Sequence, residues 1–399
     1  MIHFLLPLII VATSYPAAGP PSSAGEKEEP SVGRFTATQL IVMLRTDKRA
    51  EARRAALGLL EFIGPRYRKC PAAVTVALKE DSEESVREAA AQVLGKLAQR
   101  AHEIKEKELR DGAVETRDGA LAALRAALQN DKSPRVREAA ASALGRVGAD
   151  DPAREASLLS AQRLAVPVLI AALKDTASGT RAAAAESLGR LGQMSEEAVP
   201  ALVETFKDRK ADRFVRGYAA FAIGRIDGGG ARAAVPALGA ALVDAEAPVE
   251  VRRSAAEALR ALGTDAAGAT EQLGQALKDK SVAVRRTAAA ALGQVGPEAR
   301  AALPALEQAA RDQDKFVRAQ VLHVLGGLPQ DAARVVPLLL DGMKDQLLDV
   351  RLAAIEAFAR LGPEAKDAIP VLTAAAKNDS QGVVRDAAAE ALKKIQPNP

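Results

Sequence analysis

The sequence is poor in the residue types on which most enzyme and metal sites depend. It has no tryptophan, one cysteine (Cys70) and three histidines, which are His3, His102 and His323. A single cysteine excludes a disulfide framework, a cysteine-based zinc site and an iron–sulfur cluster. Only 3 tyrosines and 8 phenylalanines are present, so the core must be built from Ala, Leu and Val between closely packed helices. We therefore expect neither a metal nor a cofactor.

The charges nearly cancel. Lys and Arg number 55 and Asp and Glu 51, which gives a net charge of +4, and 48% of the residues are hydrophobic. This apolar content excludes a disordered chain. A small excess of positive charge, spread along a chain without tryptophan, argues against nucleic-acid binding. Because phosphate-binding glycine loops and a nucleophile with a positioned histidine are also absent, we predict no catalytic residues.

The first 24 residues contain no Asp, Glu, Lys or Arg. The apolar run Phe4–Thr13 has the length of a signal-peptide core and is too short to span a bilayer. Ser22 and Ala24 provide small side chains before a possible cleavage point. We predict a signal peptide over 1–24, a polar linker over 25–37 and an exported protein, periplasmic or extracellular. An uncleaved membrane anchor remains the alternative.

The rest of the chain, residues 38–396, repeats one pattern ten times. Each repeat contains an arginine, and successive arginines are 33 to 50 residues apart. An Asp precedes the arginine by six residues in eight repeats and by eight residues in the other two, at Asp208 and Asp244. The arginines are Arg53, Arg87, Arg137, Arg181, Arg216, Arg252, Arg285, Arg318, Arg351 and Arg385. Such a period indicates a repeat architecture.

The positions after each arginine follow a helical phase. The third is Ala in nine repeats, the seventh is Leu in eight, and the eleventh is often Gly, which we expect to end the helix in the left-handed conformation. Prolines at Pro167, Pro200, Pro236, Pro304, Pro337 and Pro370 should open the preceding helix. Each repeat is therefore predicted to be a helix pair that buries its apolar face against its neighbours. The expected fold is all-α, an α–α superhelix (right-handed solenoid).

Segments such as ALKDKSVAVRRTAAAALGQVG (276–296) resemble the HEAT-like repeats of the phycobilin-lyase type, with the pattern D-x-x-x-x-V-R-x-x-A-A-x-A-L-G. The resemblance covers about residues 38–395. It implies the fold, but the family includes scaffolds, adaptors and a few enzymes. A non-catalytic scaffold that binds a protein or peptide is the leading interpretation. A bilin-lyase-like enzyme or lyase subunit and a structural spacer of an envelope assembly are the alternatives. HEAT-like hydroxylases use several His-Glu dipeptides, whereas this chain has one, at His102.

The arginine of each repeat lies at the edge of the buried phase and needs a partner. We expect the Asp in the turn before the second helix to accept from it, which makes these pairs a structural ladder. The ladder residues are Asp131, Arg137, Asp175, Arg181, Asp279, Arg285, Asp312, Arg318, Asp345 and Arg351. The longer intervals at 98–117 and 149–166 are either irregular repeats or a lip of a binding surface.

Positions −2, +2, +5 and +9 from the arginine lie opposite the core, on the side that should face the inside of the solenoid. Position +2 is mostly Ala, and positions +5 and +9 carry self-paired charges at Glu186–Arg190, Glu356–Arg360 and Glu390–Lys394. One repeat departs from this pattern, and a weaker form follows three repeats later. We predict a binding patch made of Arg213, Phe214, Tyr218, Phe221 and Arg225, with Phe316, Gln320 and His323 as the weaker form. The alternative is that the two additional residues before Arg216 bury these rings locally.

Overall fold

The computed structural model describes residues 29–64, 67, 69–101, 107–146, 156–226 and 229–396. The predicted signal peptide (1–24) and His102 lie outside these residues. The strands are β1 (Ser31–Val32) and β2 (Phe35–Thr36). The α-helices are α2 (Ala37–Thr46), α3 (Ala50–Ile63), α4 (Lys69–Glu80), α5 (Glu84–Ala101), α6 (Lys107–Asn130), α7 (Pro134–Arg146), α8 (Ala156–Ala172), α9 (Ser178–Leu191), α10 (Val199–Lys207), α11 (Arg213–Arg225), α12 (Gly229–Ala233), α13 (Val235–Val243), α14 (Val249–Leu262), α15 (Thr270–Ala276), α16 (Val282–Val295), α17 (Leu303–Ala309), α18 (Lys315–Leu325), α19 (Ala332–Gly342), α20 (Leu348–Leu361), α21 (Ile369–Asn378) and α22 (Gly382–Ile395). Short 3₁₀ segments are η2 (Gly192–Ala198), η3 (Gly263–Ala269), η4 (Gly296–Ala302), η5 (Pro329–Asp331) and η6 (Gly362–Ala368).

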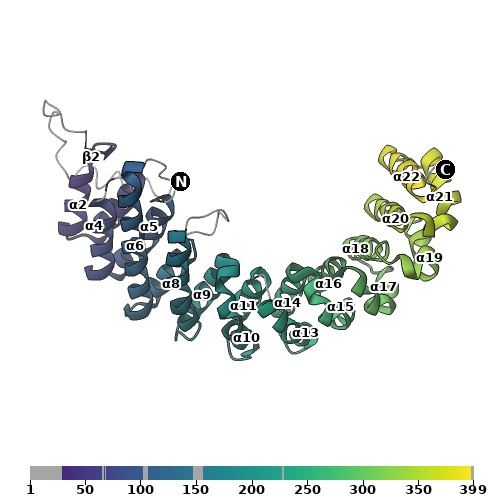
Figure 1. Cartoon of the computed structure of the whole chain (residues 1–399), viewed down its shortest axis with the longest axis horizontal. Coiled ribbons are helices and arrows are strands. Elements are labelled where there is room, and N and C mark those ends of the chain that lie inside the picture. The colour runs from purple at the N-terminus through teal and green to yellow at the C-terminus, as the bar shows by residue number, and fades with distance from the viewer. Residues whose placement is uncertain are drawn as a thin grey trace. The chain divides into compact units, whose positions relative to one another are not determined.

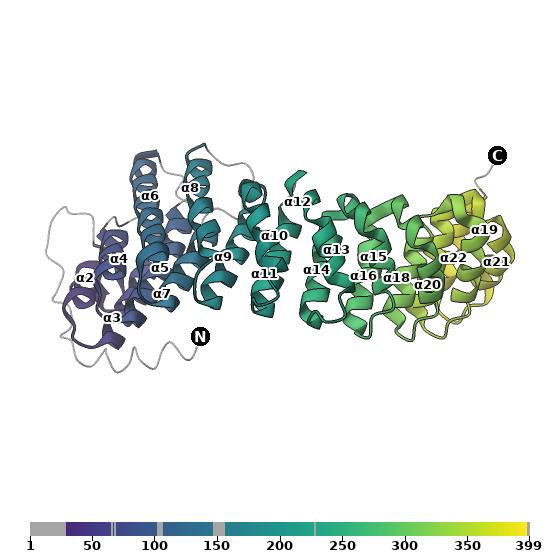
Figure 2. The same ribbon diagram turned by 90° about the horizontal axis from the view of Figure 1, so that it is seen from below.

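The chain divides into two compact parts, the N-terminal part up to Leu202 and the C-terminal part from Val203. In the N-terminal part the second helices of the repeats, α3, α5, α7 and α9, pack in sequence against one another, as do the first helices α2, α4, α6 and α8. In the C-terminal part the second helices are α11, α14, α16, α18, α20 and α22. Figure 1 shows these second helices on the inside of the curve of the C-terminal part, with the first helices α13, α15, α17, α19 and α21 on its outside. Figure 2 shows the successive helices of each part from below. The expected all-α architecture of stacked helix pairs is confirmed.

The predicted helical phase is confirmed by burial. The third residue after each repeat's arginine is fully buried in every repeat, as at Ala288 and at Val321. The seventh residue is fully buried in almost all of them, as at Leu188, Leu292 and Phe358. Small residues at the third position let neighbouring second helices approach closely, and the larger residues at the seventh fill the space between them. The core is thus a continuous row of repeated contacts within each part.

Glycine ends several second helices, but not in the conformation that we expected. Gly192, Gly263 and Gly362 have a φ of 58°, while their ψ values lie between −126° and −133°. This region is open almost only to glycine and differs from the left-handed helical one. It directs the chain into the 3₁₀ segment that leads to the next first helix. The prolines at Pro167 and Pro337 lie inside α8 and α19, so the prediction that they open their helices is wrong.

The described end of the predicted linker is ordered structure. Residues 31–36 form a small antiparallel hairpin in which Val32 pairs with Phe35. Helix α2 then begins at Ala37, capped by the side chain of Thr36 and by that of Gln39 in return. The N–H of Thr38 donates to the Glu29 carboxylate at 2.7 Å. These contacts tie residues 29–37 to the first repeat instead of leaving them as a free spacer. Among the described helices, none is long and apolar enough to cross a membrane.

Candidate interaction surface

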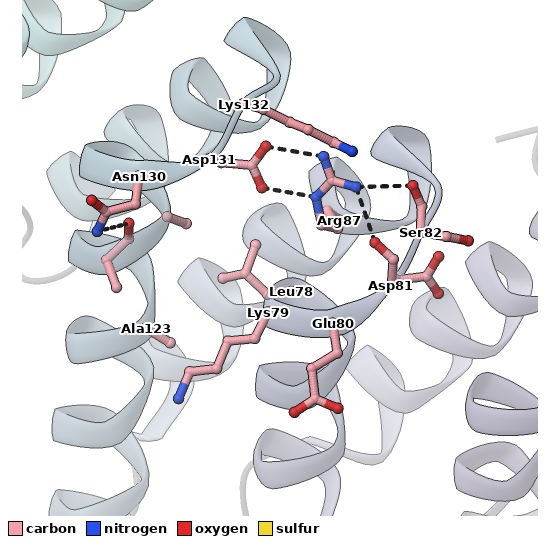
Figure 3. A pocket seen from close by; sticks show the side chains of 12 residues that line it. Leu78, Lys79, Glu80, Asp81, Ser82, Arg87, Ala123, Asn130, Asp131 and Lys132 are labelled. Carbon is pink, nitrogen blue, oxygen red and sulfur yellow. Dashed lines mark hydrogen bonds and ion pairs between the residues drawn. The ribbon is translucent and has the colours of Figure 1, made fainter.

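The repeated arginine connects adjacent repeats, as Arg87 illustrates (Figure 3). Its Nε and Nη2 donate to the two carboxylate oxygens of Asp131, in the next repeat, at 2.8 and 3.0 Å. Its Nη1 donates to the main-chain oxygens of Asp81 and Ser82 in its own repeat, at 3.0 and 3.2 Å. A planar guanidinium suits this fork, because it can bind a carboxylate with two parallel bonds and still cap a turn.

The carboxylate partner is therefore not the one that we expected. The expected Asp six residues before the arginine contributes its main-chain oxygen, and the carboxylate comes from the following repeat. The ion pairs are Arg53–Asp81 (2.7 Å), Arg87–Asp131 (2.8 Å), Arg137–Asp175 (2.7 Å), Arg252–Asp279 (2.7 Å), Arg285–Asp312 (2.8 Å), Arg318–Asp345 (2.7 Å) and Arg351–Asp379 (3.3 Å). Hydrogen bonds from Arg137 hold the pKa of Asp175 below its ordinary value, although burial acts in the opposite direction. The same carboxylate also caps its own turn by accepting from the N–H of Ala177.

Three of the ten repeat arginines have no carboxylate partner among the described residues. One is Arg385, in the last repeat, which donates to the main-chain oxygen of Asp379. Arg181 donates only to the main-chain oxygens of its own turn, those of Asp175 and Thr176. Arg216 is buried, and its Nε donates to the Phe206 carbonyl at 2.8 Å. Burial lowers the pKa of Arg216.

The next aspartate after Arg216 is already occupied. The carboxylate of Asp244 accepts from Arg209 and from the N–H of Glu246. The longer turn before α11 thus supplies a second arginine, Arg209, that takes the carboxylate.

The cavity drawn in Figure 3 has a volume of about 500 Å³ and lies between the ends of α4 and α6. Its one buried cation is Arg87, whose nitrogens are bound by Asp131 and by the turn carbonyls. No nucleophile with a neighbouring base lines it. In the described part of the chain, no group of three or more His, Cys, Asp or Glu residues could hold a metal ion. Cys70 is buried, and burial raises the pKa of its thiol to about 12, so it belongs to the core.

The predicted aromatic patch lies on α11, and its rings are exposed. Phe214, Tyr218 and Phe221 are 57%, 38% and 43% exposed, whereas Val215, Ala219 and Ile223 on the opposite side are buried. The alternative, local burial of the rings, is contradicted by these values. The Asp212 carboxylate caps the helix by accepting from the N–H of Phe214 at 2.7 Å. We call Arg213, Phe214, Tyr218, Phe221 and Arg225 the α11 face.

The weaker patch on α18 is exposed as well, but its groups are engaged. Phe316 is 48% exposed, and the guanidinium of Arg286 lies 4.4 Å from its ring centroid. The ring and the main-chain oxygen of His323 contact Nη1 of Arg360 at 2.8 and 2.9 Å. Burial and the charge of Arg360 lower the pKa of His323. Gln320 is exposed beside them.

The surface charges pair only partly as expected. Glu186–Arg190 is present at 2.7 Å, but Glu390 pairs with Lys393 at 2.6 Å instead of with Lys394. Arg360 turns to His323, so the pair expected with Glu356 is replaced.

Sequence reasoning missed one exposed ring, Phe62, which is 73% exposed at the end of α3. It occupies position +9 of the first repeat, so the phase rule that identified α11 could have found it.

Comparison with protein-family models identifies the repeats. The model described as HEAT repeats matches residues 153–214, 236–326, 270–346 and 303–393, which together make up more than half of the chain. A HEAT repeat model matches 109–150, and the PBS lyase HEAT-like repeat model matches 215–244. No curated protein matches the sequence.

Solved structures are similar in fold. A chain of the Kap95:Nup1 complex aligns with a TM-score of 0.62 and 16% identity over 90% of this chain and 50% of its own length. A chain from the structure of Kap95p with RanGDP aligns with a TM-score of 0.52 and 16% identity, over 90% of this chain and 56% of its own length. Kap121p aligns with a TM-score of 0.51 and 14% identity, over 90% of this chain and 45% of its own length. The chain thus spans about half the length of these solved chains. With stacked helix pairs, the repeated arginine and the family models in agreement, the chain belongs to the HEAT-repeat family.

Proposed function

We propose that this protein is a non-catalytic scaffold that binds a protein or peptide partner, acting after export from the cytoplasm. The observation that carries the proposal is the exposure of three large rings on one side of α11. In an ordinary repeat these positions hold small or polar residues, as at Ala283, Thr287 and Ala290 in α16. Aromatic and arginine side chains are the groups that dominate binding at protein interfaces.

The repeat architecture suits this role. The second helices of the C-terminal part lie on the inside of its curve, where a partner can contact several repeats at once (Figure 1). The related fold of Kap95 occurs in a complex with Nup1. In the cavity of Figure 3, Arg87 and Asp131 bind each other as part of the ladder, which favours the exposed side of the second helices as the place for recognition.

The test is capture of a partner by chemical cross-linking in an extract of the producing organism. Three proteins are compared: the full chain, the triple variant Phe214→Ser, Tyr218→Ser and Phe221→Ser, and the control Phe62→Ser. We expect the full chain and the control to capture the same partner and the triple variant to lose it. Equal urea midpoints for the three proteins would show that folding is unchanged. Recovery of that partner by the folded triple variant, or of no protein by the full chain, would refute the proposal.

A further inference from the structure

The α11 face carries positive charge that helix α14 compensates only in part. Between Arg213 and Arg225 the helix has three arginines and no acidic residue. Arg225 is exposed and forms no ion pair with any residue that the structure describes. The nearest carboxylate oxygen to Arg213, from Glu250, is 3.8 Å away, and both side chains are largely in solvent. A pair with this separation and exposure contributes little.

At the α18 patch, in the same row of helices, carboxylates neutralise the positive charges near the exposed ring. Arg286, which lies over the Phe316 ring, is bound by both carboxylate oxygens of Asp314 at 2.8 and 2.5 Å. Lys315, also beside that ring, pairs with Asp349 at 2.9 Å. Each cation near Phe316 thus has its own carboxylate. The two exposed aromatic sites differ in charge even though both combine rings with basic residues.

Helix α14 packs closely against α11. A Cβ placed on Gly224 would lie 2.9 Å from the Ala258 Cα and 3.2 Å from the Ala261 Cβ, so the two helices are in close contact there. A Cβ on Gly217 would lie 3.3 Å from the Ser254 hydroxyl. The α14 residues at these two points are small, so the α11 helix packs directly on α14 while its rings stay exposed.

We infer that the α11 face binds an acidic peptide segment that carries large apolar side chains. This inference rests on the proposed function and names the chemistry of the partner. The apolar side chains pack on Phe214, Tyr218 and Phe221, and carboxylates pair with the flanking Arg213 and Arg225. The helical rise places these two arginines about 18 Å apart along α11. An extended segment covers that distance in about five or six residues, so the two acidic positions should have this separation, with apolar residues between them.

The experiment is selection from a phage-displayed library of random 12-residue peptides on the immobilised full chain. We expect the enriched peptides to be net acidic and to contain Leu, Ile, Phe or Trp between acidic residues. Synthetic copies should bind the triple serine variant at least about 30-fold more weakly, the loss typical of an aromatic hot spot. Phe62→Ser should leave their affinity unchanged, and added salt should weaken binding.

Charge reversal separates this inference from the scaffold proposal. In the double variant Arg213→Glu and Arg225→Glu, the same library should yield peptides that keep the apolar residues and carry Lys or Arg in place of the acids. Enrichment of neutral or basic peptides by the unmodified chain would overturn the inference and leave the scaffold proposal in place, as long as the rings remain necessary. No enrichment would overturn it as well. The inference would also be overturned if analytical sedimentation showed a dimer that is lost in the triple variant, because the occupant would then be a second copy of this chain.

Discussion

The pairing of each arginine with the next repeat can be tested at Arg285. Its Nε and Nη2 donate to Asp312 at 2.8 and 3.1 Å, and its Nη1 donates to the main-chain oxygen of Asp279 at 3.0 Å. The side chains of Arg285 and Asp312 are only 17% and 11% exposed. We consider two double-mutant cycles, which combine Arg285→Met with Asp312→Asn or with Asp279→Asn. Only the first removes two groups whose side chains meet.

The expected energies follow from that geometry. Breaking a buried ion pair by removing one partner costs about 3–5 kcal/mol, and the partial exposure of this pair puts Arg285→Met at the lower end. Charged hydrogen bonds contribute about 1.5–3 kcal/mol, so we expect a coupling energy in this range between Arg285 and Asp312. The bond from Arg285 to Asp279 uses the main chain and survives Asp279→Asn. The coupling in the second cycle should therefore stay below about 0.5 kcal/mol.

Urea titrations followed by circular dichroism give the free energies of unfolding of the single and double variants. Each variant should keep the m-value of the unmodified chain, since the surface exposed on unfolding is the same. A larger coupling of Arg285 with Asp279 than with Asp312 would refute the inter-repeat ladder. Such a result would restore the pairing within one repeat that the spacing of six residues, found in eight repeats, suggests.

Three further outcomes are expected. Leu292→Ala, at a fully buried position, should cost about 2–5 kcal/mol in the same titration, and equal loss from the exposed Gln294→Ala would contradict the helical phase. Gly263→Ala, at φ 58°, should lower the free energy of unfolding by about 1–3 kcal/mol. Gly293→Ala should be neutral or stabilising, because Gly293 lies inside α16 and the nearest atom would be 3.6 Å from an added Cβ. An equal loss of stability in the two variants would indicate packing, and not backbone conformation, as the cause. Five ladder carboxylates have lowered pKa values in the folded chain, those of Asp131, Asp175, Asp279, Asp345 and Asp379. The unfolded chain therefore binds more protons, and stability should fall as the pH drops below about 4. A urea midpoint that stays constant from pH 5 to pH 3 would contradict this contribution of the ladder carboxylates to stability.

The fold could be predicted because the same short pattern decides burial in every repeat. Ala at the third position and Leu at the seventh identify the buried side of each second helix without knowledge of its neighbours. The glycine stops were also visible, although their ψ values depend on the 3₁₀ segment that follows. Pro337 marks the limit of such reasoning. A proline favours a helix start, but the chain before it was already helical from Ala332.

The ladder partner could not be read from spacing. Arg285 has one Asp six residues before it and another 27 residues after it, in the next repeat, and an Asp recurs at both places along the chain. The choice is made in three dimensions. The turn aspartate directs its carboxylate to the N–H two residues ahead, as Asp279 does to Ser281, and to the arginine of the repeat behind it, Arg252. Its own arginine can then reach only its carbonyl.

The same argument explains how much of the α11 face the sequence could reveal. Exposure of Phe214, Tyr218 and Phe221 follows from their phase on a single helix. The charge of a face depends instead on which acids the next repeats bring within reach. Asp314 and Asp349 compensate the cations around Phe316 from positions 28 and 34 residues away from them. No described acid does so for Arg225. Rings that look alike in the sequence therefore differ in the partner that they can attract. Of the two patches, the α11 face keeps an arginine, Arg225, without an ion pair to any described residue, and this charge can select an acidic partner.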